Sequence, residues 1–355
     1  MFLKNGNINV LYYDFDDGII EVLNNDFLPY SLKDFLQSTS YNNREESIKS
    51  GKYITALRDF LSNRLLSLTR ENAKAILNSL GLPQTLKTDE RIKIVEACQG
   101  LSMIDNFWLA EESDTRLFKD VNLRTHPLSE VAYQISLLGR TISATYDDLI
   151  PDMFTGGMFA KAWHREDNKV LLWKTNKSHV NVNVKAELKA SDYLDRLGIE
   201  HIHYCFSEVN RQPIPVCENI ATNAFSIIDG YDLQDWCQYT GTTLLDFVCK
   251  HYLTDMANMI VFDYCIANTD RHLGNIHFFV DNGTNLLAGP TPLLDHNQAF
   301  ITDLVGSDID DLTYDLTNKP FKQSAKEFYK YSTFIDKDTS FMSNACKRRL
   351  FKIVN

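Results

Sequence analysis

The stretch FDYCIANTDRHLGNIHFFVD, residues 262–281, places a dense polar octet, Asn268–Asn275, between two mostly apolar runs. A simple connection needs only a turn, so an octet that holds Asp, Arg, His and two Asn side chains needs a further explanation. Polar groups on a loop between hydrophobic elements are typical of a site that a rigid scaffold holds in position. We therefore expect chemistry at this loop.

Three oxygen-bearing side chains indicate which chemistry. Asp270 and Asn275 lie five positions apart, and Asp295 follows twenty residues after Asn275, beyond a predicted apolar strand at 276–280. Carboxylate and amide oxygens suit a Mg²⁺ ion that keeps several waters and bridges phosphates. The set favours phosphoryl transfer, in which positioning and charge neutralisation provide most of the acceleration, with Asp270 accepting the proton of the acceptor hydroxyl. The alternative is an ordinary turn, because Asp and Asn both favour turns.

The other parts that a kinase needs occur upstream in the expected order. Thr155, Gly156 and Gly157 predict a loop whose backbone amides can approach phosphate oxygens. Lys174 lies in the second strand of a predicted hairpin, where its ammonium group can reach the nucleotide phosphates, and Glu187 on the next predicted helix can pair with it. The alternatives are a plain turn, a surface lysine and a solvated helix face.

Composition limits the class of protein. The chain has 355 residues, 44% of them hydrophobic, and a formal charge of -11, which argues against general affinity for nucleic acid or an anionic membrane. Seven scattered cysteines without a CxxC pair indicate neither a disulfide framework nor a zinc ribbon. No segment approaches the roughly 18 apolar residues of a membrane span, and no signal peptide is recognisable. We expect a cytoplasmic protein.

Local patterns predict three parts in the chain. Residues 1–145 read as a mixed α/β subdomain, residues 146–223 as a sheet-containing part with a hairpin and a helix that Gly198 ends, and residues 224–355 as a helical part. The last part includes a long apolar helix at 244–267 that leads into the octet.

End signals predict two helices in the first part. Thr69 and Thr88 are the expected N-caps, and Gly81 and Gly100 the expected C-caps. Strands are expected at 8–13 and 18–23, and buried packing at 105–112, so these three ranges carry no predicted chemistry.

His272, and the pair His201 and His203, each allow more than one interpretation. His272 follows Asp270 closely enough to orient the loop or stabilise the transferring phosphate, and a packed, hydrogen-bonded histidine is equally compatible with the pattern. His201 and His203 alternate, which places both rings on one face of a predicted strand at 201–209, where they could chelate a metal. Because no further ligand is near in sequence, strand packing is the favoured interpretation.

NTDRHLGN, followed by a strand and then LLDHNQ, resembles the HipA-like family of serine/threonine kinases and, more distantly, the phosphatidylinositol kinases. The resemblance implies a two-lobed, protein-kinase-like α+β fold with a sheet-containing N-lobe, an extra mixed subdomain and a helical C-lobe. It implies that Asp270 is the catalytic base, that Asn275 and Asp295 hold Mg²⁺, that Lys174 contacts ATP, and that Glu218 to Ile220 form the hinge that receives adenine.

The resemblance also implies ATP-dependent transfer of a γ-phosphoryl group to a protein serine or threonine, in a toxin-type enzyme with an antitoxin-like partner protein and autophosphorylation at Thr155. Two departures stand out: His296 and Asn297 follow Asp295 where the family has a Gly, and Thr155 is the only hydroxyl beside the glycines. A lipid kinase, a small-molecule kinase and a nucleotide-binding pseudokinase are the alternatives.

Overall fold

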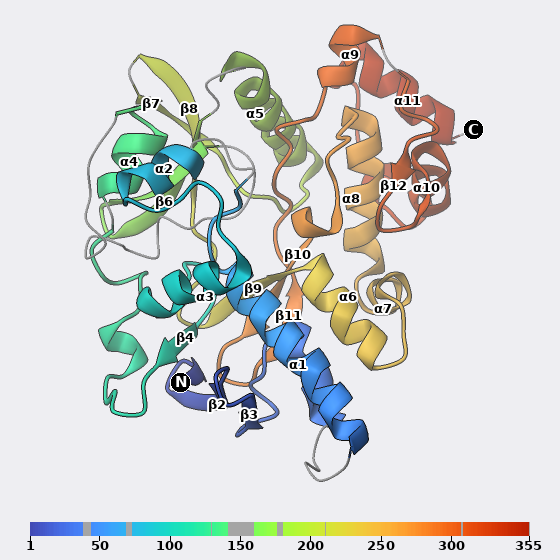
Figure 1. Ribbon diagram of the computed structural model, residues 1–355. Helices are drawn as coiled ribbons and strands as arrows, with labels where there is room; N and C mark the ends of the chain where they lie inside the picture. The colour runs from blue at the N-terminus through green and yellow to red at the C-terminus, as the bar shows by residue number, and fades with distance from the viewer. Residues whose placement is uncertain are drawn as a thin grey trace. The chain divides into compact units, whose positions relative to one another are not determined.

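A computed structural model describes residues 1–37, 44–68, 73–128, 130–140, 160–175, 180–209, 211–306 and 308–354. The chain divides into two compact units that interleave along the sequence (Figure 1). Unit 1 comprises Met1–Asn176, Glu218–Ile227 and Val280–Leu287, and unit 2 comprises Lys177–Cys217, Ile228–Phe279 and Ala288–Asn355. The three-part division expected from the sequence stays a prediction.

Unit 1 contains an antiparallel sheet with the strand order β3-β2-β1-β4. Its strands are β1 (Phe2–Asn5), β2 (Ile8–Asp14), β3 (Ile19–Val22) and β4 (Phe107–Ala110). The two strands expected near the N-terminus are confirmed. All four residues of β4 are buried, as expected for packing. β4 comes from a distant part of the chain and pairs with β1.

Unit 1 also contains helices. They are η1 (Tyr30–Gln37), α1 (Arg44–Asn63), α2 (Ala73–Ser79), α3 (Thr88–Ala97), η2 (Phe118–Asp120) and α4 (Glu130–Ser136). Gly81 follows α2 with φ +68°, in agreement with its expected role, whereas Thr69 lies outside the described residues. The N-cap of α3 is Lys87 and not Thr88, because Glu90 reaches back to accept a hydrogen bond of 2.7 Å from the Lys87 amide.

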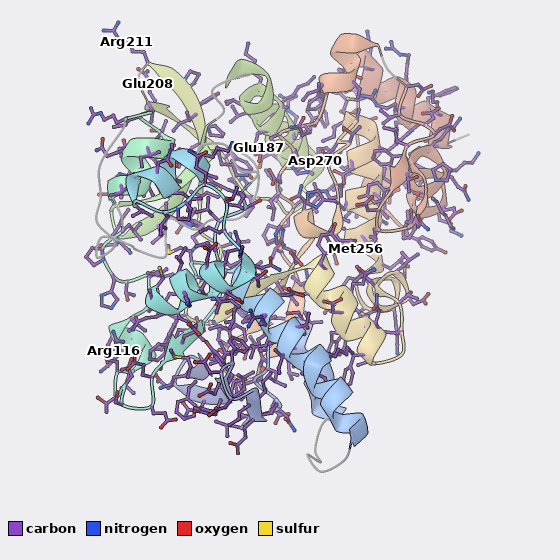
Figure 2. The ribbon with its side chains drawn as sticks, viewed as in Figure 1. Arg116, Glu187, Glu208, Arg211, Met256 and Asp270 are labelled. Carbon is purple, nitrogen blue, oxygen red and sulfur yellow. The ribbon has the colours of Figure 1, made fainter. Side chains whose placement is uncertain are left out.

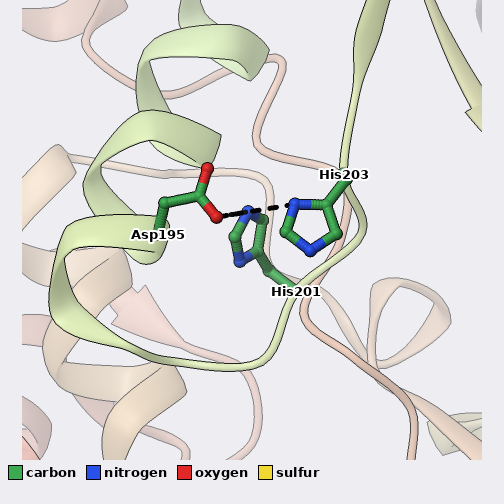
Figure 3. A group of neighbouring side chains, drawn as sticks. All are labelled: Asp195, His201 and His203. Atoms are coloured by element: carbon green, nitrogen blue, oxygen red, sulfur yellow. Dashed lines mark ion pairs between the residues drawn. The ribbon is translucent and has the colours of Figure 1, made fainter.

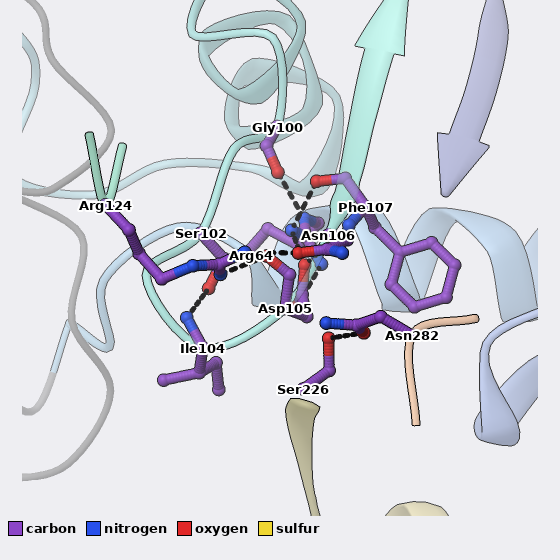
Figure 4. Close-up of polar contacts among 10 residues, drawn as sticks. All are labelled: Arg64, Gly100, Ser102, Ile104, Asp105, Asn106, Phe107, Arg124, Ser226 and Asn282. Carbon is purple, nitrogen blue, oxygen red and sulfur yellow. Dashed lines mark hydrogen bonds and ion pairs between the residues drawn. The ribbon is translucent and has the colours of Figure 1, made fainter. Parts of the chain in front are cut away.

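Polar contacts in unit 1 hold the segment before β4 in place (Figure 4). Arg64, just beyond α1, lies with Nη2 2.8 Å from Asp105 Oδ1 and donates to the carbonyl of Phe107 at 3.1 Å. Arg124 donates to the Asp105 carbonyl at 3.1 Å and to the Asn106 side chain. The backbone that leads into β4 is therefore fixed by two arginines.

A hairpin also belongs to unit 1. β5 (Ala160–Glu166) and β6 (Lys169–Thr175) pair in register, with Lys161 opposite Lys174. Asp167 and Asn168 connect them with φ values of 44° and 66°, a left-handed pair that matches the twist of the strands. The expected hairpin is confirmed, and the expected phosphate loop at 155–157 lies outside the described residues.

Unit 2 begins with α5 (Val180–Leu197), which ends as expected at Gly198, where φ is +61°. The strand expected at 201–209 is shorter: β7 starts at Cys205 and ends at Val209, and it pairs with β8 (Gln212–Glu218). His201 instead forms an isolated parallel bridge with Leu293. The alternating residue pattern that predicted the strand therefore begins at His201, before the strand itself begins at Cys205.

The helical part consists of α6 (Gly230–Tyr239), α7 (Leu244–His251), α8 (Leu253–Ile266), α9 (Ile301–Val305), α10 (Phe321–Tyr329), η6 (Thr333–Asp336) and α11 (Asn344–Val354). The prediction of a single long helix at 244–267 is wrong. It is divided at Tyr252, whose φ of -138° and ψ of 35° are not helical. Because α8 is apolar on all sides and buried from Met256 to Ile266, hydrophobic periodicity did not mark this break.

The described part of the chain also contains several short strands, and one of them, at residues 277–281, follows the polar octet. β9 (Phe225–Asp229), β10 (His277–Asp281) and β11 (Leu286–Pro290) form a sheet with the order β11-β10-β9, and β12 (Thr313–Tyr314) pairs with β13 (Lys319–Pro320). The octet therefore connects the buried helix α8 to the central strand β10. Within the described part of the chain, no helix is both long and apolar enough to cross a bilayer.

Candidate active site

The polar octet starts where α8 ends. Ala267, the C-cap residue, has φ +53° and ψ +48°, and the amide of Asn268 donates to the Asp263 carbonyl at 2.8 Å. A left-handed residue other than Gly costs roughly 1–2 kcal/mol, so the surrounding contacts must hold this turn in place. The chain is thereby redirected from the buried helix into the loop that carries Asp270.

Asp263, on the last turn of α8, is fully buried and accepts hydrogen bonds from three side chains. Asn268 Nδ2, Arg271 Nε and Tyr314 Oη each lie 2.9 Å from one of its carboxylate oxygens. Burial lowers the pKa of Arg271, but the Asp263 carboxylate outweighs burial, so the pKa stays above its ordinary value. The guanidinium is therefore a fixed positive charge.

Arg271 also joins the two loops that carry the expected metal ligands. Its Nη1 donates to the carbonyl of Asn275 at 2.6 Å and to the carbonyl of Leu294, the residue before Asp295, at 2.8 Å. Asp295 itself has φ +61°, and Asn297 Nδ2 donates to its Oδ1 at 2.7 Å. Asp295 is thus the left-handed residue at this turn, and Asn297 stabilises it in a sequence that lacks the family's Gly.

Asp270 is half-buried on this loop (Figure 2). Burial raises the pKa of its carboxyl group, and the nearby charge of Asp295 raises it further, while His272 and Arg271 act in the opposite direction. Asn275 Nδ2 donates to the Asp270 carbonyl at 2.9 Å. The side-chain oxygen of Asn275 takes no part in this bond. Two carboxylates and an amide oxygen, the donors that Mg²⁺ prefers, are therefore carried on backbone segments that Arg271 holds together.

His272 and two glycines set the path of the loop. His272 Nδ1 accepts a hydrogen bond of 3.1 Å from the amide of Gly274, and its ring stacks on Tyr231 at a centroid distance of 6.5 Å. A Cβ atom on Gly274 would lie 3.0 Å from the His272 ring, and one on Gly230 would lie 2.7 Å from the Leu273 carbonyl oxygen. Both glycines permit close approaches that larger residues would prevent.

A cavity of about 80 Å³ lies beside Asp270 within unit 2. The residues that line it come from the octet, from the segment around β12 and from α10: Asn268, Thr269, Asp270, Arg271, His272, Leu312, Thr313, Tyr314, Asp315 and Phe321. Asp270 therefore faces a space that a small group can enter.

The remaining expected site residues are divided between the units. Lys174, on β6, belongs to unit 1. Glu187, on α5 in unit 2, is only 1% exposed, which excludes a solvated helix face (Figure 2). Lys174 and Glu187 are each positioned on the expected element, and their pairing stays a prediction.

The expected hinge lies in unit 1. Glu218 Oε2 accepts from Lys169 Nζ at 2.6 Å on the surface, and the amide of the next residue, Asn219, donates to the Val170 carbonyl at 2.8 Å. Asn219 Nδ2 also donates to the Met103 carbonyl at 3.0 Å. These contacts fix the segment from Glu218 to Ile220, and its contact with adenine stays a prediction.

Three positioning residues were missed in the sequence: Asp263, Tyr314 and Gly230. A signal existed for Asp263, because an ionisable residue inside the apolar run MIVFDYCI must be paired if that run is buried. Tyr314 and Gly230 gave no local signal, because their roles arise from contacts with distant residues.

Comparison with known proteins identifies the family. The family model for phosphatidylinositol 3- and 4-kinase matches residues 148–349, more than half of the chain. The chain belongs to this kinase family. The kinase has no match among curated proteins.

Two solved structures are similar to this kinase. HipA of the Shewanella oneidensis MR-1 toxin–antitoxin system, solved with HipB and operator DNA, has a TM-score of 0.52 at 13% identity, covering 99% of this chain and 87% of that chain. The Helicobacter pylori proinflammatory kinase CtkA has a TM-score of 0.42 at 14% identity, covering 55% and 88%. The expected α+β, HipA-like kinase fold is confirmed by the first similarity, and kinases of this fold generally use a nucleotide and a divalent metal.

Proposed function

We propose that this kinase transfers the γ-phosphoryl group of Mg-ATP to a serine or threonine hydroxyl of a protein. The observation that carries the proposal is the contact set of Arg271, which binds Asp263, the Asn275 carbonyl and the Leu294 carbonyl at once. The loop with the candidate base and the loop with the second candidate metal ligand are thereby fixed to one buried ion pair.

Each residue has a proposed role. Bound Mg-ATP would provide the phosphoryl group and neutralise charge on its oxygens. Asn275 and Asp295 hold the ion through side-chain oxygens, and Lys174 contacts the nucleotide phosphates. Asp270 orients the acceptor hydroxyl and takes its proton while the hydroxyl oxygen bonds to phosphorus and the bond from phosphorus to the ADP oxygen breaks.

The rest of the nucleotide site is proposed from the same resemblance. Thr155, Gly156 and Gly157 cover the phosphates with backbone amides, and Glu187 orients Lys174. Glu218 and Ile220 receive adenine through their backbone groups. His272 positions the loop through its bond to Gly274.

The cavity beside Asp270 supports a side-chain acceptor. Its volume of about 80 Å³ is well below the roughly 300–1,000 Å³ of pockets that enclose whole small molecules. Its lining carries the acids Asp270 and Asp315, while the positive charge of Arg271 is already paired with Asp263. Such a lining disfavours an anionic inositol phosphate and suits a neutral hydroxyl.

The family match keeps a lipid kinase as the second candidate. Labelled ATP should be offered separately to a protein lysate, to phosphatidylinositol vesicles and to soluble polyols, with Asp270→Asn as the control. We expect labelled protein only, and we expect the variant to lose this label. Label in lipid or polyol would instead assign the acceptor to that class, and nucleotide binding without any Asp270-dependent transfer would make the chain a pseudokinase.

Partner and regulation are proposed from the resemblance. The similar HipA structure contains HipB and operator DNA, and we propose a small antitoxin-like protein as partner for this chain, with nucleic acid reached through that partner. We also propose autophosphorylation at Thr155. Mass spectrometry after incubation with ATP should find phosphate on Thr155 in the wild type and not in Asp270→Asn, and an unmodified Thr155 in the wild type rules this out.

A further inference from the structure

A second group of candidate ligands lies at the end of α5, within unit 2 (Figure 3). Asp195 is on the last turn of this helix, and His201 and His203 follow on the segment after Gly198. His203 Nδ1 lies 3.5 Å from Asp195 Oδ1, and His201 Nε2 lies 3.8 Å from the same oxygen. All three ligand atoms lie within 4.8 Å of one another.

These separations approach those of a tetrahedral metal site. Two ligands at 2.0–2.1 Å from a tetrahedral ion are about 3.3 Å apart. The distances of 3.5 and 3.8 Å from Asp195 Oδ1 are close to this value, and the two histidine ligand atoms, within 4.8 Å of each other, must approach further by side-chain rotation to hold one ion. Asp195 and His203 are both largely exposed, with 55% and 75% of their side-chain surface accessible, so such rotations meet little resistance.

The hydrogen bonds of His201 orient its ring for ligation. His201 Nδ1 lies 2.9 Å from the Ile199 carbonyl oxygen, which can only accept, so Nδ1 carries the proton. The lone pair is then on Nε2, the atom that faces Asp195. A backbone carbonyl that binds the second ring nitrogen is the usual outer contact of a metal-bound histidine. Ser191 Oγ lies 2.9 Å from Nε2 and donates a hydrogen bond to this lone pair. A bound ion would replace that hydrogen bond.

We propose that Asp195 Oδ1, His201 Nε2 and His203 Nδ1 bind one Zn²⁺ ion, with water as the fourth ligand. Two imidazoles and one carboxylate suit Zn²⁺ and not Mg²⁺, which favours oxygen ligands. The site differs in residues and in ligand type from the candidate Mg²⁺ site at Asn275 and Asp295, and it does not depend on the proposed kinase reaction.

The ion has a structural role, because it joins the end of α5 to a segment that pairs with the chain leading to Asp295. The Ile202 amide donates to the Leu293 carbonyl at 2.8 Å, and the Leu293 amide donates to the Glu200 carbonyl at 3.1 Å. Leu293 lies two residues before Asp295. Zinc binding therefore stabilises unit 2 near the backbone that positions Asp295.

Zinc binding to untagged, chelator-treated protein tests the proposal, by calorimetric titration with ZnCl₂ in an excess of MgCl₂ and by metal analysis after dialysis. We expect one Zn²⁺ per chain and a higher thermal midpoint with zinc than without it. Asp195→Asn and His203→Gln should each weaken zinc affinity by about tenfold or more. Both positions are exposed, so the variants should fold normally.

Matched controls distinguish this site from general surface binding. Asp192→Asn lies on the same helix at 54% side-chain exposure, and His251→Gln removes another exposed histidine. Both controls should bind zinc as the wild type does, and so should Asp270→Asn, whether or not that variant transfers phosphate. Absence of stoichiometric binding, or equal affinities in Asp195→Asn and Asp192→Asn, would overturn the proposal.

Discussion

Asp263 Oδ2 and Arg271 Nε lie 2.9 Å apart, and both side chains are almost completely excluded from solvent. Because Arg271 also binds the carbonyls of Asn275 and Leu294, this ion pair supports the backbone on both sides of the candidate metal site. Removing one partner of a buried pair leaves the other charge uncompensated, which is more costly than losing an exposed pair.

Asp263→Asn should therefore lower the free energy of unfolding by about 3–5 kcal/mol, because it retains the shape of the side chain and leaves the Arg271 charge buried. Denaturant titration measures this change. The control is Asp192→Asn, which breaks the pair with Arg196 in which each side chain is 54% exposed, and it should cost no more than about 1 kcal/mol. Equal losses in the two variants would contradict the buried geometry.

Gly230→Ala should disturb the loop through contact alone. The new Cβ would lie 2.7 Å from the Leu273 carbonyl oxygen, a backbone atom that must then move. We expect a loss of about 1–3 kcal/mol in stability and a lower kcat for phosphoryl transfer. Gly51→Ala, in the exposed part of α1 with open space around its Cβ, should be neutral or stabilising.

Asp270→Asn should raise the thermal midpoint of metal-free protein at neutral pH. Burial raises the folded-state pKa of Asp270 above its ordinary 3.8, so the group contributes stability below pH 3.8 and this contribution is lost as the pH rises through the folded-state pKa. Asparagine stays neutral, so the gain should appear near pH 7 and vanish below pH 3.8. Thermal unfolding at several pH values measures it.

The same variant should lower kcat by about 10²–10⁴-fold if Asp270 is the base. Wild-type activity should fall on the acid side at a pH above 3.8, because only the ionised carboxylate accepts a proton. Rapid-quench assays with the identified acceptor check both outcomes. An unchanged rate in Asp270→Asn would remove the assigned role.

A comparison of Asp295→Asn with Asp295→Ala should distinguish the effect of backbone strain on stability from the effect of losing a carboxylate on Mg²⁺ affinity. Asp295 has φ +61°, a conformation that Asn tolerates and that costs Ala roughly 1–2 kcal/mol. Both variants should lose Mg²⁺ affinity, but only Asp295→Ala should be less stable than the wild type in denaturant titration. Retained Mg²⁺ affinity in both would exclude Asp295 as a ligand.

Alkylation at pH 8 should distinguish the cysteines. Burial raises the pKa of Cys98 to about 12 and that of Cys237 to about 11, so neither thiol is ionised or accessible, whereas Cys205 is exposed. Mass spectrometry of briefly treated native protein should find the label on Cys205 first, and denatured protein should be labelled at all seven. Early modification of Cys98 would contradict its burial.

The sequence by itself determined the features that depend on local rules. The polar stretch 165–168 marked the hairpin turn, which the structure confines to Asp167 and Asn168. Gly198 marked the end of α5, and the octet with LLDHNQ indicated the kinase fold, because turn chemistry and motif spacing act over a few residues. Local rules failed at Tyr252, where an apolar pattern continued through a helix break.

Only the tertiary structure decided which distant side chains meet. Tyr314 reaches Asp263 across 51 positions of sequence, and Asp195 reaches His203 across the end of a helix. Such contacts depend on how buried elements pack and on the need to pair polar groups removed from water. Sequence spacing carries no measure of either. This is why the pattern of His201 and His203 by itself favoured strand packing, whereas the folded chain brings the Asp195 carboxylate beside both rings.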